Sequence, residues 1–213
     1  MKIEKLTLGQ LATNCYLVYD EKSREAVVVD PADEGSFIIQ RITDLHLQPK
    51  IIIATHGHFD HLLGGTEVKL AFDIPFVIHR ADLEILKRTQ STAKHFLGMA
   101  CDPPPMIDKF IHDNDKISFG AEELKVIETP GHTPGSISLY TPHFLLSGDT
   151  LFSSHVGRTD THYGSKTTIL NSIGNKLFKL PPETLVFPGH GQTTTIKAEM
   201  KNLKDELRNN LVN

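Results

Sequence analysis

The sequence predicts an α/β fold in which two β-rich halves pack face to face with helices on the outside. Short apolar runs typical of strands alternate with segments of helical periodicity in the first half of the chain, and the same alternation returns in the second half. An irregular stretch lies between the two halves. Because no linker and no shift in composition separates them, residues 1–213 are expected to form a single domain.

The first half of the chain alternates between strands and helices. It begins as an antiparallel meander of three strands, because the polar turn at residues 21–24 separates two apolar runs. Helical periodicity then alternates with two further short strands, and Pro49 and Pro75 end the helices. The predicted strands cover residues 3–8, 14–19, 26–29, 51–54 and 76–78, and the predicted helices cover residues 34–47 and 62–72.

The middle of the chain is less regular than the two halves. Between residues 80 and 115 a helix is predicted only at 82–88, and the three prolines at 103–105 prevent any helix from continuing. This stretch is either a loop over a binding site or an inert surface connection. The remaining predicted strands cover residues 116–119, 123–127, 136–140, 144–146 and 185–187, and the remaining helices cover residues 168–180 and 196–211.

Composition excludes several classes of protein. The chain is 39% hydrophobic and 23% charged, which is typical of soluble globular proteins. A net charge of −4 without a run of Lys or Arg argues against nucleic acid as a partner. No apolar window is long enough to span a bilayer, residues 1–5 begin no secretory signal, and two cysteines, Cys15 and Cys101, indicate no disulfide framework. A cytoplasmic protein with no membrane partner is expected.

A dense cluster of metal-ligand residues occupies positions 56–61, directly after a predicted strand. His56 and His58 are two apart, so an extended segment points both rings to the same side. Asp60 and His61 follow at the predicted start of a helix, where adjacent side chains diverge by about 100°. Four ligand-type residues aimed in two directions suit two metal ions better than one.

Three more ligand-type side chains follow short strands later in the chain. His132 lies between two Pro-Gly pairs, which exclude regular structure and hold the ring on a tight loop. Asp149 follows a strand end, and His190 is framed by two glycines. With the first cluster they make seven candidate ligands on loops, where functional residues are commonly placed. The other seven of the twelve histidines are scattered and are expected at the surface or beside the site: His46, His79, His95, His112, His143, His155 and His162.

These motifs resemble those of the metallo-β-lactamase fold superfamily over about residues 14–191. Within it the chain is most similar to the glyoxalase II group. The resemblance implies an α/β (α+β) architecture, a four-layer αββα sandwich with the site at one edge of the two sheets. The pieces that match the superfamily are Thr55-His56-Gly57-His58-Phe59-Asp60-His61, Gly131-His132, Gly148-Asp149 and Gly189-His190. The pieces that match the glyoxalase II group in particular are residues 129–136, 147–152, 157–158 and 188–191.

The resemblance also implies how the ligands divide between two ions. Two zinc ions are expected, with iron or manganese as alternatives, because sites of histidine and carboxylate accept all three metals. Asp60 is in addition the expected catalytic residue. One ion would be held by His56, His58 and His132, the second by Asp60, His61 and His190, and Asp149 would bridge them.

Two further sequence features concern the part of a substrate that lies away from the metals. Two-domain glyoxalase II enzymes carry a C-terminal helical domain that contributes to glutathione binding. Only 23 residues follow His190, so the chain resembles the shorter, single-domain hydrolases of bacteria. Arg158 is a candidate substrate contact, because a guanidinium can fork onto a carboxylate, although an ordinary ion pair would explain it equally well.

Asp30, at the end of the third predicted strand, has two alternative roles. It either caps the following helix or accepts a hydrogen bond from a ligand histidine. In neither role does it bind metal.

Two divalent ions that share a water lower its pKa to near neutral, which gives hydroxide at physiological pH. A thiolate, whose parent thiol has a pKa of roughly 8.5, departs without a general acid, whereas an amide nitrogen needs a proton donor. No general-acid motif is evident beyond the ligands. Leaving-group chemistry therefore favours attack of a metal-bound hydroxide on a small-molecule thioester, and the resemblance to the glyoxalase II group implies S-2-hydroxyacylglutathione, such as S-lactoylglutathione, as that thioester.

Other functions are alternatives to this prediction. Persulfide dioxygenases of the same superfamily use a single iron, resembling a site of His56, His132 and Asp149, but the ending at residues 188–191 favours a hydrolase. No residue in the sequence excludes lactonase activity. A β-lactamase is less favoured, because one major class has a cysteine where Asp149 stands. A metal-binding module without catalysis is disfavoured by the complete ligand set.

Overall fold

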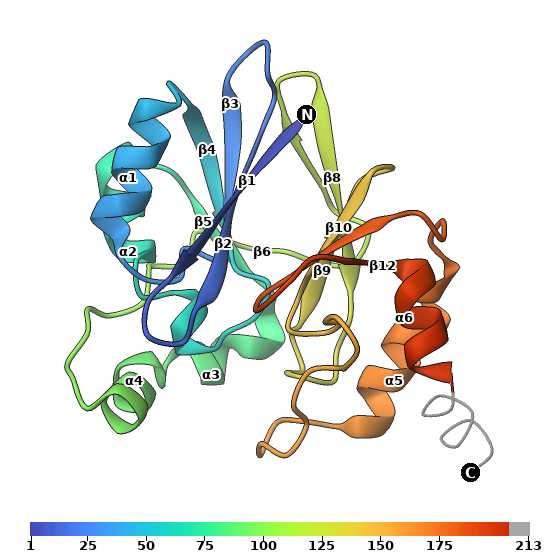
Figure 1. The fold of residues 1–213 in the computed structure, drawn as a ribbon. Helices are drawn as coiled ribbons and strands as arrows, with labels where there is room; N and C mark the ends of the chain where they lie inside the picture. The colour runs from blue at the N-terminus through green and yellow to red at the C-terminus, as the bar shows by residue number, and fades with distance from the viewer. Residues whose placement is uncertain (205–213) are drawn as a thin grey trace.

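The apolar runs of the chain form two six-stranded sheets that pack face to face (Figure 1). The structure is a computed structural model and describes residues 1–204. The first sheet contains β1 (Lys2–Leu8), β2 (Thr13–Tyr19), β3 (Glu25–Val29), β4 (Gln48–Ile53), β5 (Phe76–Ile78) and β6 (Lys109–Phe110) in that order. The second contains β12 (Thr194–Thr195), β11 (Leu185–Pro188), β10 (Phe144–Gly148), β9 (Ile137–Tyr140), β8 (Glu122–Glu128) and β7 (Lys116–Phe119) in that order.

Helices cover the outer face of each sheet (Figure 1). In Figure 1, α1 and α2 lie to the left of the first sheet, α5 and α6 lie to the right of the second, and α3 and α4 lie near the lower edge. The predicted four-layer αββα sandwich is therefore confirmed. The helices are α1 (Gly35–Asp44), α2 (Gly65–Phe72), α3 (Leu83–Leu86), α4 (Thr89–Leu97), α5 (Lys166–Asn175) and α6 (Ile196–Asn202), with short 3-10 helices η1 (Phe59–His61), η2 (Arg80–Asp82) and η3 (Leu177–Lys179).

Alternation along the strands explains how both faces of the first sheet are filled. In β2, Tyr16 and Val18 point into the core between the sheets, whereas Cys15 and Leu17 point toward the helices on the outer face. All four side chains are at most 2% exposed. A strand that is buried on both faces needs apolar residues at every position, and this is why such strands appear in the sequence as continuous apolar runs.

The directions of the strands bring several strand ends to one edge of the sandwich. The strands β1, β2 and β3 form the predicted antiparallel meander, and β3 to β6 are parallel. In the second sheet β10 is parallel to β11, and β9 is antiparallel to both β8 and β10, so β8, β10 and β11 share one direction. The loops that follow β4, β8, β10 and β11 carry the seven candidate ligands, and these loops meet.

The strand before the first motif starts earlier than predicted. It begins at Gln48 and includes Pro49, at which the sequence predicts the end of a helix. The pairing of β4 with β3 is irregular at this point, because the register shifts between Ala26 and Val27. Proline is tolerated at such bulges, where no ladder hydrogen bond is needed.

The helix predicted to begin beside Asp60 and His61 instead begins at Gly65. Asp60 and His61 lie in the separate 3-10 helix η1, in which adjacent side chains diverge by about 120°. The predicted angle was therefore wrong in value, but the two side chains still point in different directions.

Sequence periodicity missed α4, β6 and β12. In α4 only Thr89 and Ala93 are buried, so the helix has no apolar repeat. The strands β6 and β12 contain two residues each, which is too short for any pattern. The last predicted helix is present as α6, and residues 205–211 of that prediction lie outside the described residues.

Two further expectations concern cysteine and membranes. Cys15 and Cys101 are both free thiols. Within residues 1–204, no helix has the length and apolar character that crossing a bilayer requires.

Leu139 tests the core between the sheets, because its side chain is fully buried there. We expect Leu139→Ala to lower the free energy of unfolding by about 2–5 kcal/mol, through lost burial and a residual cavity. Leu70→Ala is the matched control, since Leu70 is 77% exposed and the change should cost less than about 0.5 kcal/mol. Urea unfolding of the two variants measures both values, and equal stability would contradict the assigned core.

Candidate metal centre

The structure brings all seven predicted ligand side chains together at one edge of the sandwich. They come from η1 and the loop before it, and from the loops after β8, β10 and β11. Within each of three overlapping groups, one ligand atom from every residue lies within 4.8 Å of the others. The groups are His56, His58 and His132; Asp60, His61 and His190; and His56, His61 and Asp149.

The first group consists of imidazoles alone. His58 Nδ1 lies 2.9 Å from His132 Nε2, and the ring of His56 stands at 79° to that of His132 with the centroids 4.8 Å apart. His56 is 1% exposed and His132 is 4% exposed. Three imidazole nitrogens thus converge in a buried place, as the resemblance implies for the first ion.

The second group combines a carboxylate with two imidazoles. Asp60 Oδ2 lies 3.3 Å from His190 Nε2 and 3.6 Å from His61 Nε2. Asp149 lies between the two groups, because its Oδ1 is 3.5 Å from His61 Nε2 and its Oδ2 is 3.6 Å from His132 Nε2. A carboxylate with an oxygen toward each group has the position expected of a bridging ligand.

Three buried ligand atoms have no hydrogen-bond partner among the described residues: His56 Nε2, His61 Nε2 and Asp149 Oδ1. Leaving such an atom unpaired costs about 1–3 kcal/mol. Neutral imidazole and carboxylate are also the donors that divalent zinc, iron and manganese accept. The residues present therefore fit a centre of two divalent ions.

Four of the five imidazoles are oriented through the nitrogen that faces away from the cluster. Such hydrogen bonds fix the tautomer and the ring plane of a metal-binding histidine. His58 differs from the others, since it presents Nδ1 to the cluster. The four contacts are His56 Nδ1 to Thr55 Oγ1 at 3.1 Å, His61 Nδ1 to Asp30 Oδ2 at 2.9 Å, His132 Nδ1 to the carbonyl of Arg158 at 2.8 Å, and His190 Nδ1 to the carbonyl of Leu11 at 3.1 Å.

Asp30 supports a ligand histidine and does not cap α1. Its carboxylate accepts hydrogen bonds from the backbone N–H and the hydroxyl of Thr55, both at 2.7 Å, besides its contact with His61. Asp30 is 1% exposed and has a positive φ of 50°, and the residue at the N-cap of α1 is Glu34. Of the two roles left open by the sequence, hydrogen bonding to a ligand histidine is the correct one.

Asp82 supports the site, although the sequence gives it no role. Its buried carboxylate accepts hydrogen bonds from the N–H of Gly57 at 2.8 Å, the N–H of Gly135 at 2.6 Å and the hydroxyl of Thr133 at 2.7 Å. Gly57 lies between two ligands of the first motif, and the other two residues follow His132. One carboxylate therefore joins two loops that carry ligands. Nothing marks it in the sequence, where it is one Asp in a predicted helix.

Electrostatics divide the imidazoles into two kinds. Burial and then the neighbouring imidazoles hold the pKa of His56 well below its usual range, and burial and then His132 lower the pKa of His58 to about 4. Burial also opposes protonation of His61, but the carboxylates of Asp149, Asp60 and Asp30 outweigh it and raise the pKa of His61 to about 10. A metal that binds His61 must displace this proton, so metal affinity is expected to rise with pH.

Main-chain hydrogen bonds join the two sheets beside the cluster. The N–H of Ile137 donates to the carbonyl of Thr55 at 2.8 Å, and the N–H of Asn14 donates to the carbonyl of Gly189 at 2.7 Å. Gly189 has no room for a side chain, because a Cβ there would meet His61 Cε1 at 2.7 Å and would lie still closer to Asp149 Oδ1. The glycine before His190 is therefore required by close approach to the cluster.

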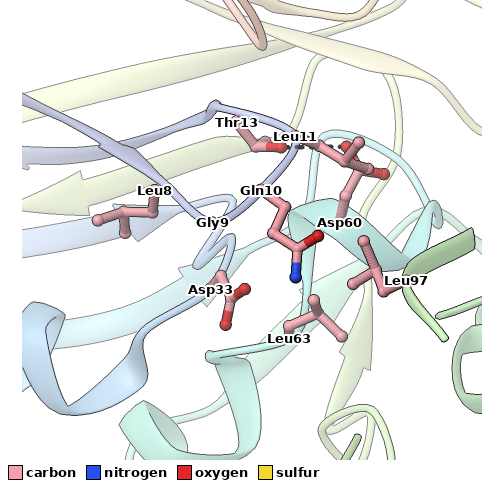
Figure 2. A pocket seen from close by; sticks show the side chains of 9 residues that line it. All are labelled: Leu8, Gly9, Gln10, Leu11, Thr13, Asp33, Asp60, Leu63 and Leu97. Carbon is pink, nitrogen blue, oxygen red and sulfur yellow. Dashed lines mark hydrogen bonds between the residues drawn. The ribbon is translucent and has the colours of Figure 1, made fainter. Parts of the chain in front are cut away.

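A small pocket opens beside Asp60 (Figure 2). Thr13 Oγ1 donates to Asp60 Oδ2 at 3.1 Å on one side of it, and Leu63 and Leu97 line another side. Leu97 belongs to α4, and Phe96 of the same helix stacks on Phe59 of the motif with ring centroids 6.0 Å apart. Part of the middle of the chain therefore packs beside the site as a helix, where the sequence predicts a loop or an inert surface connection, and a role in substrate access stays a prediction.

A larger groove of about 430 Å³ adjoins this pocket and shares Asp33, Leu63 and Leu97 with it. Among its described lining residues there is no Lys or Arg, whereas four carboxylates are present. The groove therefore attracts positive charge and repels negative charge. The four acidic residues are Asp33, Glu34, Glu67 and Asp102.

Arg158 is placed differently from the predicted ligands. Its guanidinium forks onto Asp160 at 3.0 and 3.1 Å, and the side chain is 75% exposed. The residue contributes to the centre through its carbonyl oxygen, which accepts from His132. A role for its side chain in substrate binding stays a prediction.

Comparison with known proteins identifies relatives over nearly the whole chain. The family model of the Metallo-beta-lactamase superfamily matches residues 8–190, which include all seven ligands. The probable metallo-hydrolase YqgX of Bacillus subtilis is 35% identical over 202 residues, covering 93% of this chain and 94% of its own. The hydroxyacylglutathione hydrolase GloC of Haemophilus influenzae is 30% identical over 210 residues, covering 94% of this chain and 96% of its own.

Solved structures have the same fold. The B3 metallo-beta-lactamase BLEG-1 is 34% identical with a TM-score of 0.87, covering 94% of this chain and 97% of its own. TTHA1623 in a di-iron-bound form is 33% identical with a TM-score of 0.85, covering 93% of this chain and 98% of its own. ETHE1 from Myxococcus xanthus is 27% identical with a TM-score of 0.79, covering 95% of this chain and 83% of its own.

Asp30→Asn tests the orientation of His61. The change keeps the shape and the positive φ, which Asn tolerates, but it replaces an acceptor oxygen facing His61 Nδ1 by an amide donor. We expect metal affinity to fall by about 10–100-fold, because the ring then favours the tautomer with its proton on Nε2. Competition with a chromophoric chelator measures this, with exposed Asp44→Asn as the control. Unchanged affinity would show that Asp30 does not set the tautomer.

Asp82→Ala tests the link between the two ligand loops. It leaves two buried N–H groups without an acceptor, so we expect the free energy of unfolding to fall by about 2–4 kcal/mol. Asp82→Asn, which keeps one acceptor oxygen, should lose less. Denaturant unfolding combined with metal titration checks both variants. A stable Asp82→Ala protein with normal metal affinity would contradict the role assigned to this carboxylate.

Proposed function

The chain belongs to the metallo-beta-lactamase superfamily, and we propose that it is a dinuclear metallo-hydrolase that cleaves thioesters, with S-2-hydroxyacylglutathiones such as S-lactoylglutathione as substrates. The observation that carries the proposal is the convergence of seven ligands in two groups, with Asp149 between them. The similarity to a hydroxyacylglutathione hydrolase at 30% identity supports the choice of substrate.

His190 supports a second metal position and hence a hydrolase. Its Nε2 lies 3.3 Å from Asp60 Oδ2 and 3.7 Å from Asp149 Oδ2. A single ion held by His56, His132 and Asp149 would leave His61, Asp60 and His190 without a metal to bind. The complete second group therefore favours two ions over one.

Two bound ions would lower the pKa of a shared water and polarise the substrate carbonyl. Asp60 contributes a charged oxygen beside them. Burial opposes its ionisation, but His61 and then the hydrogen bond with His190 hold the pKa of Asp60 below its usual value. Thr13 Oγ1 fixes the direction of this carboxylate by donating to Oδ2. Asp60 is thus an ionised acceptor at neutral pH, suited to orient an attacking water.

The residues around the pocket favour a leaving group that needs no proton. Among the described residues that line it there is no Lys, Tyr or His to act as a general acid. A thiolate departs unprotonated, because its parent thiol has a pKa of roughly 8.5. An amide nitrogen does not, and this supports a thioester as the substrate.

The acidic groove limits how a glutathione thioester can lie. Glutathione carries two carboxylates and one ammonium group at neutral pH. The carboxylates of Asp33, Glu34 and Glu67 would repel the former and attract the latter. The ammonium shares its carbon with one carboxylate, so the γ-glutamyl end is neutral overall and the glycine end is negative. In the proposed complex the γ-glutamyl end therefore lies toward the groove with its ammonium foremost, and the glycine carboxylate points away from it.

A persulfide dioxygenase is the second candidate, because ETHE1 from Myxococcus xanthus shares the fold. If this chain were such a dioxygenase, it would use one iron, held by a set such as His56, His132 and Asp149. Metal content therefore separates the two candidates.

The test combines metal analysis with turnover of a panel of substrates. We expect two metal ions in the seven-ligand centre and faster hydrolysis of S-lactoylglutathione than of a lactone or a β-lactam. His58→Ala should lower thioester turnover by about 100-fold or more, because a bound ion contributes several kcal/mol to the barrier. His143→Ala, at an exposed position, is the matched control and should keep full activity.

Three outcomes would contradict the proposal. One iron per chain with oxygen uptake on glutathione persulfide would assign the dioxygenase activity. Efficient lactone hydrolysis without thioesterase activity would change the substrate class. Full turnover by a folded His58→Ala variant would remove the metal centre from the reaction.

A further inference from the structure

A second group of metal-ligand residues lies outside the seven-ligand cluster. One ligand atom each from His79, His112 and Glu128 lies within 4.8 Å of the others. His79 Nε2 is 3.1 Å from Glu128 Oε1, and the rings of His79 and His112 have centroids 5.6 Å apart at 82°. From the sequence, both histidines are expected at the surface or beside the site.

The three side chains come from both sheets. His79 directly follows β5, His112 lies two residues beyond β6, and Glu128 is the last residue of β8. The group therefore spans the junction of the two sheets. Glu128 is four residues before His132, so the group adjoins the loop that carries this candidate ligand.

The loop that carries His112 is held in place before any ion binds. The N–H of Glu128 donates to Asp113 Oδ1 at 2.8 Å, and the N–H of Asp113 donates to Glu128 Oε1 at 3.1 Å. The N–H of His112 donates to Asp115 Oδ2 at 2.8 Å. Lys176 binds the carbonyl oxygen of Glu128, so it does not neutralise the Glu128 side chain by a direct contact.

We propose that His79, His112 and Glu128 form a separate zinc site that joins the two sheets. Two imidazoles and a carboxylate are a common set of three protein ligands for zinc, with water at the fourth position. The carboxylates of Asp113 and Asp115 add negative charge beside it. Glu128 is 33% exposed and His112 is exposed, which gives an ion and its water access from solvent.

Zinc binding changes the tautomer of His79. The N–H of Ala81 donates to His79 Nδ1 at 3.3 Å, so the neutral ring carries its proton on Nε2 and donates it to Glu128. A zinc ion at Nε2 requires the ring proton on Nδ1. Zinc binding therefore breaks the His79–Glu128 hydrogen bond and the long contact between Ala81 and His79 Nδ1. The accompanying move of the ring proton from Nε2 to Nδ1 can be detected at the two ring nitrogens.

Zinc titration of the full chain tests the site. We expect the wild type, with its other sites filled, to bind one zinc ion more than His112→Ala or Glu128→Gln. Glu128→Gln keeps a hydrogen-bond acceptor but removes the charge, and exposed His143→Ala is the matched control that should equal the wild type. Thermal unfolding confirms that each variant is folded.

Nitrogen chemical shifts of His79 in the wild type give a second measurement that needs no variant. On addition of zinc, we expect the proton to move from Nε2 to Nδ1 and the Nε2 signal to take a metal-bound shift. Equal zinc stoichiometry in the wild type and both variants would overturn the proposal. So would an unchanged His79 tautomer, or binding weaker than ~1 mM, a level that corresponds to non-specific affinity.

Discussion

Desolvation of clustered imidazoles and carboxylates is the constraint on which the rest of this structure depends. Five rings and two carboxylates lie with their ligand atoms within 4.8 Å of one another in overlapping groups, and three of these atoms have no hydrogen-bond partner in the described chain. Such a cluster is unfavourable in a protein interior unless bound ions or fixed dipoles compensate it. Four of the five rings are held in one orientation by a hydrogen bond through the nitrogen that faces away from the cluster, so these rings do not turn freely toward water. Metal binding and ring orientation therefore both offset the free-energy cost of burying this cluster.

In the two-sheet architecture, the ligands of this cluster come from parts of the chain that are remote in sequence. Four ligands follow β4 in the first sheet, while His132, Asp149 and His190 follow strands of the second. A hydrogen bond from the N–H of Ile137 to the carbonyl of Thr55 joins the two sides, and Asp82 holds the loops on either side of the junction with one carboxylate. A small displacement of one sheet against the other would separate ligands of the same ion. The apolar core between the sheets thus sets the ligand geometry as well as the stability.

The sequence predicted the layers and the seven clustered side chains because both depend on local patterns. Apolar runs identify buried strands, and glycine and proline beside histidine identify the turns that present ligands. Asp82 escaped prediction because its partners, Gly57 and Gly135, are reached only through the fold. The helix α4 escaped because its buried face contains Thr89 and Ala93, which give no apolar period. For Asp30 the sequence supplied two roles, and only the position of His61 in space distinguished them.

Main-chain carbonyls orient two of the candidate ligand rings. The carbonyl of Arg158 serves His132 and that of Leu11 serves His190, while the side chains of both residues are largely exposed. Any amino acid with the same backbone path supplies the same acceptor. Mutations at these two positions can therefore change what the surface around the centre contacts without altering ring orientation. The arrangement makes the hydrolytic centre robust to substitution while its surroundings remain evolvable, which gives a physical route by which one fold acquires new substrate preferences.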